Sequence, residues 1–519
     1  MNESGFITLL GILVAVYPLL PKEKKLELKF YLTRFDWLVI IILGLVIHFI
    51  IFFDYFKTLD FQTPEFIRDS NLNRDQYVYL VFLILAVYLF IRSKFVSINR
   101  FNIKAANLLF EEELNQRKYY EVFNLLKNHF NDLIKIEKNL NLRNKIARYI
   151  APLNPFEIVL DKKNPGFLDR NIPNVLKKLS EFFKSPDQGQ QYATNILNRL
   201  FSNKEFIEYT ALNHPYSALT FFNCSHHRME AFLSHFFSTL FDHKSSVLYF
   251  ELSNYSSIGP GRFNIHESNK LLYFLFDDVK VSRKLRIYKP VGDKITELLE
   301  NDEILIKNYN KPSLKYIKLD QEKCPIVIGT TFFSFMINES MHQGLKDHMW
   351  LAYFRTFIKT ILENLNPDND ANIEDEYPTP FHYLIYHIFQ IMLGWYDDYE
   401  HVIDKDIILY EKECLSPEGR SIVKSNLLTL GNITYLTMSN NKLSYEFKVY
   451  IFEIIMRRID KKSTHTDYLK INDLLLMSII NDGANNRKDS DYIALLKDIL
   501  CESDFYGLSS AESLQNLLT

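Results

Sequence analysis

Residues 37–53 read WLVIIILGLVIHFIIFF, a run of 17 residues without Asp, Glu, Lys or Arg. Two similar runs lie on either side of it, at 5–20 and 77–91, and charged segments separate the three. A hydrocarbon core about 30 Å thick needs roughly 20 apolar residues per helix, and flanking Lys or Arg stems can extend a slightly shorter run. Buried core helices have the same composition, but three successive runs near one end favour a membrane. We predict a transmembrane module over residues 1–96, with helices at about 5–20, 37–53 and 77–95.

The basic residues between these runs predict the orientation of the module. Five lie between residues 22 and 34 and four between residues 92 and 104, whereas the loop between the second and third runs has three against five acids. Because cytoplasmic loops carry the excess of Lys and Arg, we expect the N-terminus outside and residues 92–519 in the cytoplasm. This makes a multi-pass protein of the cell inner membrane. A cleaved signal peptide is disfavoured, because the first run follows acidic Glu3 and ends at Pro18 and Pro21 without a small-residue cleavage site.

His48 is the one conventionally ionisable residue well inside an apolar run. A polar group within a membrane is a functional hypothesis by default. We predict that His48 lines a pore or makes a helix contact. A neutral histidine hydrogen-bonded to a neighbouring helix is the simpler interpretation.

Composition and periodicity predict a mainly α-helical protein, with a large, mostly helical cytoplasmic region after the membrane module. Apolar content is 47%, charged content is 24% and glycine is scarce at 15 of 519 residues, so wholesale disorder is excluded and helices are favoured. We predict a helical connector at 97–201 and a C-terminal helical array at 341–519. Between them, 202–340 reads as a mixed α+β section that senses a ligand. Its strand candidates are 246–252 and 324–331, separated by helices near 269–279 and 293–300.

The sequence shows little sign of catalysis. The net charge of −3 gives no general argument for nucleic-acid binding. No phosphate-binding Gly-x-x-x-x-Gly-Lys-Ser/Thr loop and no Gly-x-Ser-x-Gly nucleophile motif is present. Six histidines lie between residues 214 and 266, but they lack the paired spacing of a zinc site. We therefore predict no catalytic residues, no metal site and no cofactor.

A basic segment in the central section is the best candidate for a binding site. Residues 280–294 hold six basic side chains against one acid, and a Gly-Pro-Gly turn at 259–261 precedes them. Glycine-turn amides beside guanidinium groups suit an anion or phosphate, and a helix starting near residue 289 would favour an anion at its N-terminus. A protein or lipid interface and a plain solvated face are the alternatives. The predicted ligand residues are Arg262, Lys270, Arg283, Lys284, Arg286 and Lys289.

This layout resembles the prokaryotic anti-phage membrane effectors, in which a short transmembrane bundle is joined to a cytoplasmic sensor. The resemblance rests on architecture, and no residue motif carries it. It implies a nucleotide or oligonucleotide as signal, membrane disruption as output, and a partner protein encoded nearby. We predict a ligand-regulated homo-oligomeric channel or membrane-disrupting protein in the lipid bilayer. A membrane-tethered nuclease or phosphohydrolase, and a protein-binding scaffold, are the alternatives.

Overall fold

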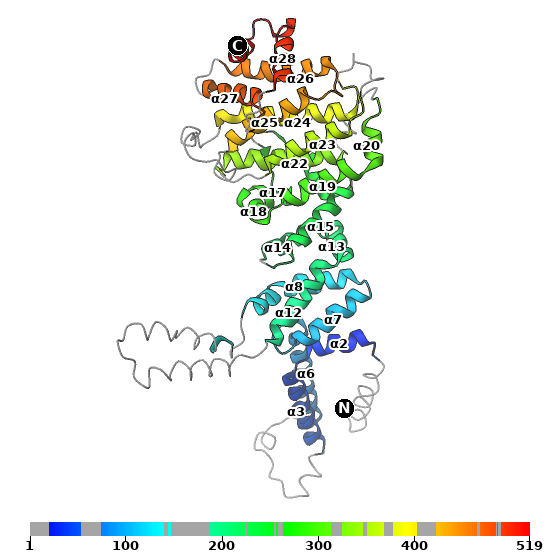
Figure 1. Ribbon diagram of the computed structural model, residues 1–519. Helices are drawn as coiled ribbons and strands as arrows, with labels where there is room; N and C mark the ends of the chain where they lie inside the picture. Colours follow the sequence, from blue (N-terminus) through cyan, green and yellow to red (C-terminus); the bar gives the residue numbers. More distant parts are fainter. Residues whose placement is uncertain are drawn as a thin grey trace, which may run out of the picture. The chain divides into compact units, whose positions relative to one another are not determined.

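The computed structural model is almost entirely helical (Figure 1). Residues 1–206 and residues 207–519 form two compact units. Each unit is described separately below. The described residues are 20–52, 74–139, 144–146, 187–224, 226–253, 256–257, 263–312, 324–345, 350–367, 377–401, 422–463, 468–483, 485 and 489–519.

The first unit consists of a helical hairpin and a small helical body. Helices α3 (Arg34–Ile51) and α6 (Arg74–Lys94) form the hairpin. They cover the second and third predicted membrane segments, and the first, at 5–20, lies outside the described residues apart from its last position. The helices of the body are α2 (Lys22–Tyr31), α7 (Ile103–Asn115), α8 (Tyr119–Lys138) and α12 (Gln188–Ser202).

Amphipathic faces hold this body together. Leu26 and Phe30 of α2 are buried in this body, where α2 packs on α7, while Lys22, Lys24 and Lys29 of the same helix are exposed. Helices α7, α8 and α12 pack on one another around buried residues such as Phe123, Leu126 and Leu200. Apolar positions three and four residues apart give each helix one buried face, which is the pattern that predicted the connector.

The second unit begins with short helices around an aromatic core. Phe222, Phe232, Phe236 and Phe332 are all fully buried, and their rings make stacked and edge-to-face contacts. Many of the 42 phenylalanines of the chain therefore serve a core. The helices described between residues 204 and 312 are α13 (Lys204–Asn213), which starts in the first unit, α14 (Pro215–Phe222), α15 (Met229–Asp242), α16 (Val247–Ser253), α17 (Lys270–Phe276), α18 (Val279–Leu285), α19 (Tyr288–Asn301) and α20 (Glu303–Tyr309).

The predicted α+β section is wrong. The strand candidate 246–252 is helix α16, and the candidate 324–331 is the start of α22 (Pro325–His342). Apart from the two-residue strands β1 (Ser256–Ser257) and β2 (Phe263–Asn264), no strand occurs in the described residues. Both candidates are short apolar runs, which a buried strand and a buried helix share. Helix α22 is buried on nearly every side, so its sequence lacks the alternation that would have identified it.

The rest of the second unit is a two-layer stack of helices. One layer contains α19, α23 (Leu351–Asn364), α25 (Ile422–Met438) and α27 (Leu469–Ile480). The other contains α22, α24 (Pro380–Asp397), α26 (Tyr445–Lys462) and α29 (Ser509–Leu518). Helix α28 (Ser490–Ile499) and the short 3-10 turns η1 (Asp398–His401) and η5 (Ser503–Phe505) are the other elements described in this unit.

Buried polar pairs link neighbouring helices of this stack. The Asn338 side chain of α22 donates to Asp398 at 3.0 Å, and the Tyr396 hydroxyl of α24 donates to Asn472 of α27 at 2.5 Å. A buried polar group without a partner is costly, so such pairs fix which helices lie together. Each helix of a layer packs mainly on the next helix of the same layer, as in the succession α19, α23, α25 and α27.

Candidate functional site

The first turn of α3 is closed by a cap formed by Thr33 and Asp36. The backbone N–H and the hydroxyl of Thr33 both donate to Asp36 Oδ2 at 2.6 Å, and the backbone N–H of Asp36 donates to Thr33 Oγ1 at 3.5 Å. This reciprocal capping box satisfies donors that a helix start leaves free. Helix α3 therefore begins at Arg34, three residues before the apolar run.

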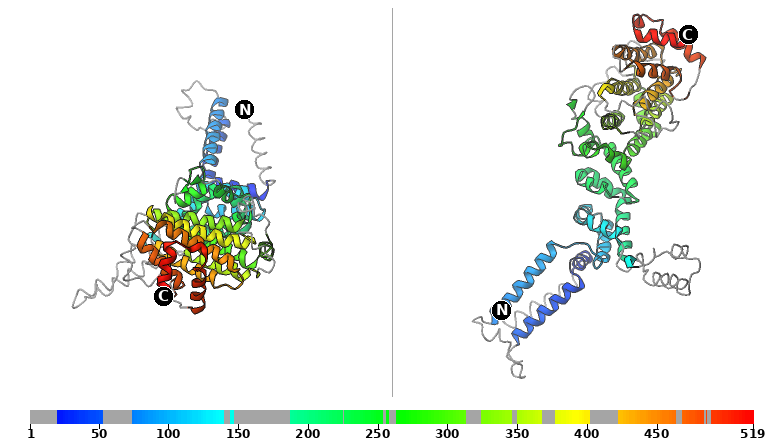
Figure 2. Two further views of the ribbon diagram at one scale, coloured as in Figure 1. Left: turned by 90° about the horizontal axis from the view of Figure 1, so that it is seen from above. Right: turned by 90° about the vertical axis from the view of Figure 1, so that its left-hand side faces the viewer.

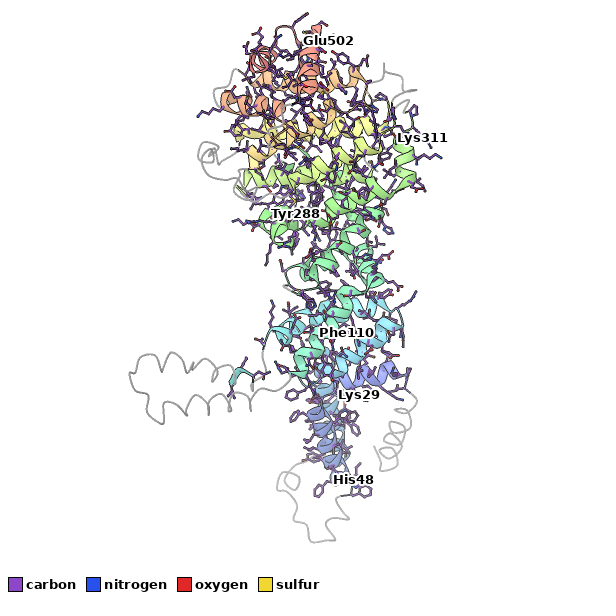
Figure 3. The ribbon with its side chains drawn as sticks, in the orientation of Figure 1. Lys29, His48, Phe110, Tyr288, Lys311 and Glu502 are labelled. Carbon is purple, nitrogen blue, oxygen red and sulfur yellow. The ribbon has the colours of Figure 1, made fainter. Side chains whose placement is uncertain are left out.

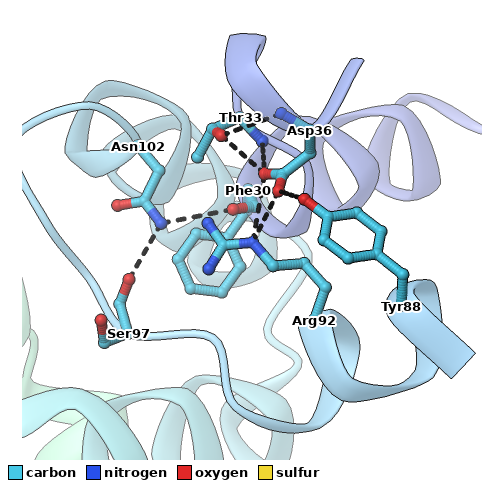
Figure 4. A network of polar contacts seen from close by, with 7 residues as sticks. All are labelled: Phe30, Thr33, Asp36, Tyr88, Arg92, Ser97 and Asn102. Atoms are coloured by element: carbon cyan, nitrogen blue, oxygen red, sulfur yellow. Dashed lines mark hydrogen bonds and ion pairs between the residues drawn. The ribbon is translucent and has the colours of Figure 1, made fainter. Parts of the chain in front are cut away.

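Asp36 also connects α3 to α6. The Tyr88 hydroxyl donates to Asp36 Oδ1 at 2.5 Å, and Arg92 Nε donates to Oδ2 at 3.1 Å (Figure 4). Asp36 has an exposed fraction of only 2%, and its two carboxylate oxygens accept hydrogen bonds from Thr33, Tyr88 and Arg92. This carboxylate therefore holds the two helices together at their base.

The two helices run antiparallel. The start of α3 meets the end of α6 at Asp36, and the end of α3 meets the start of α6 in a small apolar core of Ile47, Ile50 and Val78. Figure 2 shows the pair side by side in its right-hand view. The hairpin is thus joined by a polar network at its base and by apolar packing at its far end.

The outward faces of this hairpin are apolar. Of the 26 exposed large apolar side chains of the described residues, seven lie on α3 and seven on α6. Contiguous exposed apolar surface of this extent marks an interaction site rather than an ordinary protein surface. The fourteen residues are Phe35, Trp37, Leu38, Ile41, Ile42, Leu45, Val46, Tyr79, Leu80, Leu83, Ile84, Val87, Phe90 and Ile91.

The length of the hairpin is close to the thickness of a bilayer. Helix α3 has 18 residues and α6 has 21, which at 1.5 Å per residue gives about 27 Å and about 31 Å. Within the described residues no single helix is both long and apolar enough to count as a membrane span. Segments Lys24–Tyr31 and Phe35–Ile51 meet the requirement of length and hydropathy only when taken together, as a pair of helices bent by 87°. Gln76–Arg92 is a shorter apolar helix.

His48 lies on the exposed surface near the far end of the hairpin, where Figure 3 labels it. Its ring lies against Phe52, with ring centroids 4.5 Å apart. It is outside the small core formed by Ile47, Ile50 and Val78. His48, the predicted pore or contact residue, is therefore exposed on the surface of α3.

The base of the hairpin is fixed to the body of the first unit. Asn102, just before α7, donates through Nδ2 to the carbonyls of Phe30 at 3.3 Å and Ser97 at 3.0 Å, which ties the end of α2 to the exit of α6 (Figure 4). Lys22 of α2 and Glu112 of α7 form an ion pair at 2.5 Å. Helix α2 and the chain after α6 therefore lie on the same side of the hairpin.

No family model, curated protein or solved structure matches this chain.

The predicted phosphate residues are dispersed over several elements. Arg283 and Lys284 are exposed in the last turn of α18 and Arg286 is its C-cap, where cations also favour the helix dipole. Lys289 forms an ion pair with Glu230 of α15 at 2.7 Å. Lys270 lies over the ring of Tyr216, with Nζ 5.5 Å from its centroid. Arg262 and the glycine turn at 259–261 lie outside the described residues.

The central histidines do not converge on a metal site in the part of the chain that the structure describes. The ring of His226 lies tilted against that of His227 with centroids 4.4 Å apart, and His226 Nδ1 accepts from the backbone N–H of Arg228 at 3.1 Å. Burial, and to a lesser extent His227 and Arg228, lower the pKa of His226 to about 4. No group of three or more metal-ligating side chains is found among the described residues.

The network at Asp36 was missed by the sequence analysis. The Thr-x-x-Asp spacing of residues 33–36, directly before an apolar run, is a recognisable capping pattern. Nothing in the sequence indicates that Tyr88 and Arg92 meet the same carboxylate, because their pairing depends on the antiparallel register of two helices.

Proposed function

We propose that this protein is a ligand-regulated membrane effector whose α3–α6 hairpin inserts into the inner membrane, with several copies forming a channel or a membrane-disrupting assembly. The exposed apolar surface of the hairpin carries this proposal. Fully burying one large apolar side chain stabilises by about 1.5–3 kcal/mol, so transferring fourteen half-exposed ones from water is worth on the order of 10 kcal/mol. Insertion into a bilayer removes the whole apolar surface of the hairpin from water.

The packing of α2 supports the proposed topology. Charge counting alone puts the loop that contains α2 on the cytoplasmic side together with residues 92–519. The contacts of α2 with α7, including the ion pair between Lys22 and Glu112, require both elements to share one side. Two independent arguments thus agree on a hairpin that crosses and returns.

The base of the hairpin offers a route for regulation. Two helices cannot enclose an aqueous path, so conduction needs several copies around an axis. His48, on the exposed surface, would then face a neighbouring copy or the path between copies. Because Asp36 joins α3 to α6 and Asn102 joins α2 to α7, a shift of the body would move both crossings together.

We further propose that the cytoplasmic helical region senses a nucleotide-like or other phosphate-bearing signal through the exposed cations at the end of α18. Arg283 and Arg286 are the residues to replace first, since both guanidinium side chains are exposed at the end of α18. Alanine at both positions should abolish the response to the signal while the assembly stays intact. If the protein is a membrane-tethered enzyme, this variant should keep its catalytic activity. If the protein is a scaffold, the variant should lose only the binding of its protein partner.

Membrane potential and dye entry in bacteria that express the full chain test the effector itself. Leu45→Arg and Ile84→Arg place a charge on the middle of each hairpin helix, at side chains with exposed fractions of 63% and 50%. A charge at this depth costs about 2.5–3.5 kcal/mol on insertion. Both variants should abolish depolarisation and dye entry.

The matched control is Ile304→Arg, at a side chain that is 75% exposed on α20 of the other unit. It makes the same chemical change without touching the hairpin, so depolarisation should persist. An unchanged membrane potential with the wild-type chain, with and without a phage challenge, would reject the effector and favour a scaffold or a tethered enzyme.

A further inference from the structure

Exposed aromatic rings surround the base of the hairpin, where it meets the body. Trp37 is 43% exposed in the first turns of α3, Phe95 is 69% exposed directly after α6, and Phe101 is 91% exposed just before α7. None of them is needed for the core of the unit. At this level of a membrane protein the amphipathic ring of Trp favours the headgroup region, and exposed Phe side chains favour the boundary between headgroups and acyl chains.

Three lysines with exposed ammonium groups accompany these rings. Lys29 is on α2, Lys94 is the last residue of α6, and Lys104 is the second residue of α7. Lys94 Nζ lies 5.9 Å from the ring centroid of Phe90 and 5.8 Å from that of Phe95. Figure 3 labels Lys29 beside the base of the hairpin, at the end opposite His48. The cations and the rings thus lie on or next to the elements that meet at the base of the hairpin, namely α2, the start of α3, the end of α6 and the start of α7.

Nearby acids do not neutralise these lysines in the part of the chain that the structure describes. Asp36 forms an ion pair with Arg92. Glu27 forms one with Lys24 at 2.5 Å, and Glu112 forms one with Lys22 at 2.5 Å. The described carboxylates near the junction are therefore already paired, and the remaining positive charge faces outward. Such an arrangement complements a surface of phosphate groups.

The angle of α2 fits a membrane surface. Segments Lys24–Tyr31 and Phe35–Ile51 meet at 87°, so α2 lies parallel to a bilayer when α3 crosses it. Leu26 and Phe30 face the body, which leaves Lys29 available to the headgroup layer. The bend occurs over Leu32 and Thr33, the positions where the capping box starts α3.

We propose that Trp37, Phe95, Phe101, Lys29, Lys94 and Lys104, the junction surface, bind the headgroups of anionic phospholipids in the cytoplasmic leaflet. This inference rests on the proposed insertion of the hairpin and specifies its lipid partner. Anionic headgroups would fix the depth of the hairpin and hold the junction at the membrane. The chain then distinguishes anionic bilayers from neutral ones.

Trp37 is a natural probe of this binding. The chain has three tryptophans, and Trp350 and Trp395 are only 1% and 2% exposed in the other unit. Full-length protein in detergent is diluted into vesicles of phosphatidylcholine with brominated acyl chains, with or without phosphatidylglycerol, and Trp37 emission is followed. Because bromine quenches a tryptophan in contact with lipid, we expect quenching with both lipids and tighter binding to the anionic vesicles. Salt should weaken only the anionic preference.

The decisive variant is Lys29→Gln combined with Lys94→Gln and Lys104→Gln. A basic residue near an anionic surface contributes about a fivefold change in affinity, so the triple variant should bind anionic vesicles on the order of a hundredfold more weakly. Its binding to neutral vesicles should be unchanged, which also shows that it is folded. Lys244→Gln with Lys470→Gln and Lys497→Gln, all exposed in the other unit, is the charge-matched control and should bind as the wild type.

Each possible result bears on a defined claim. Equal wild-type affinity for both vesicle types, or unchanged anionic binding by the junction variant, overturns the headgroup proposal and leaves hairpin insertion standing. Equal losses in the junction and control variants also overturn it, because net charge then explains the effect. No change of Trp37 emission with either lipid rejects insertion itself, and with it the proposed function.

Discussion

The Tyr88 hydroxyl donates a 2.5 Å hydrogen bond to the buried carboxylate of Asp36, which lies 52 residues earlier in the chain. This bond, with the Arg92 contact at 3.0 Å, is the polar link between the two hairpin helices at their base. Because the same carboxylate also caps α3, one side chain both starts the helix and sets its register against α6.

Asp36→Asn should therefore open the base of the hairpin. It removes the charge that Arg92 faces and weakens the cap, at a cost of about 2–3 kcal/mol, and Tyr88→Phe should cost about 1–2 kcal/mol. Hydrogen exchange of the first turns of α3, measured by mass spectrometry in detergent, reports the change. Tyr79→Phe is the control for Tyr88→Phe, since Tyr79 also lies on α6 and its side chain is 69% exposed. Equal exchange in the Tyr88 and Tyr79 variants would contradict the assignment.

The stability of the second unit should fall as pH drops from about 6.5 to about 4. Burial lowers the pKa of His387 to about 4, its Nε2 is buried without a hydrogen-bond partner among the described residues, and its ring stacks on Tyr383. The unfolded chain, with a histidine pKa near 6.5, takes up the proton first, so protonation favours unfolding by at most about 3 kcal/mol.

His387→Phe keeps a ring on Tyr383 and removes the titrating group. The free energy of unfolding, from urea titrations between pH 4 and pH 7.5, should then depend less steeply on pH. Part of the slope should remain, because the pKa of His226 is also lowered to about 4. His266→Gln, at an exposed side chain, should leave the profile unchanged. A profile of His387→Phe that coincides with the wild type would reject the role of this ring.

How far the sequence predicted the fold depended on whether each helix has a polar face. Helix α28, which has exposed polar residues along one side, falls in the C-terminal helical array predicted at 341–519. Helix α16 was mistaken for a strand. It is only seven residues long, and its acid, Glu251, is fully buried and accepts from the backbone N–H groups of Leu271 and Leu272. A short, buried segment offers no period that separates helix from strand.

The sequence predicted only those parts of the candidate site that local composition reveals. Apolar runs identify α3 and α6 because their composition alone is unusual, and the alternation of charge gave an orientation. The contact between α2 and α7 and the shared carboxylate of Asp36 depend on tertiary structure between distant segments, which a single sequence does not encode locally. The basic composition of residues 280–294 could be read from the sequence. The ion pair of Lys289 with Glu230 and the position of Lys270 over the ring of Tyr216 could not.

Two glycines of the helical stack should respond to alanine in opposite directions. A Cβ at Gly431 of α25 would lie 2.0 Å from Ser478 Oγ and 2.5 Å from the Ser478 backbone on α27, whereas a Cβ at Gly394 of α24 meets nothing within 4 Å. Gly431→Ala should destabilise by about 1–3 kcal/mol, and Gly394→Ala should stabilise by about 0.5–1 kcal/mol. Thermal unfolding followed by circular dichroism measures both. A neutral Gly431→Ala would mean that α25 and α27 are not so closely packed.

The proposed topology predicts where thiols react. Cys501 is exposed while Cys224 and Cys324 are buried, so in a Cys414→Ser background Cys501 is the thiol that reacts. A membrane-impermeant maleimide should label it in inside-out vesicles and leave it unlabelled in intact cells. Adding Ser70→Cys in a Cys501→Ser chain should reverse this pattern, because residue 70 falls in the loop predicted to lie outside. Lys25→Cys on α2 should behave as Cys501 does, since α2 packs on α7. Labelling of Lys25→Cys from outside would place α2 and α7 on opposite sides and contradict the hairpin.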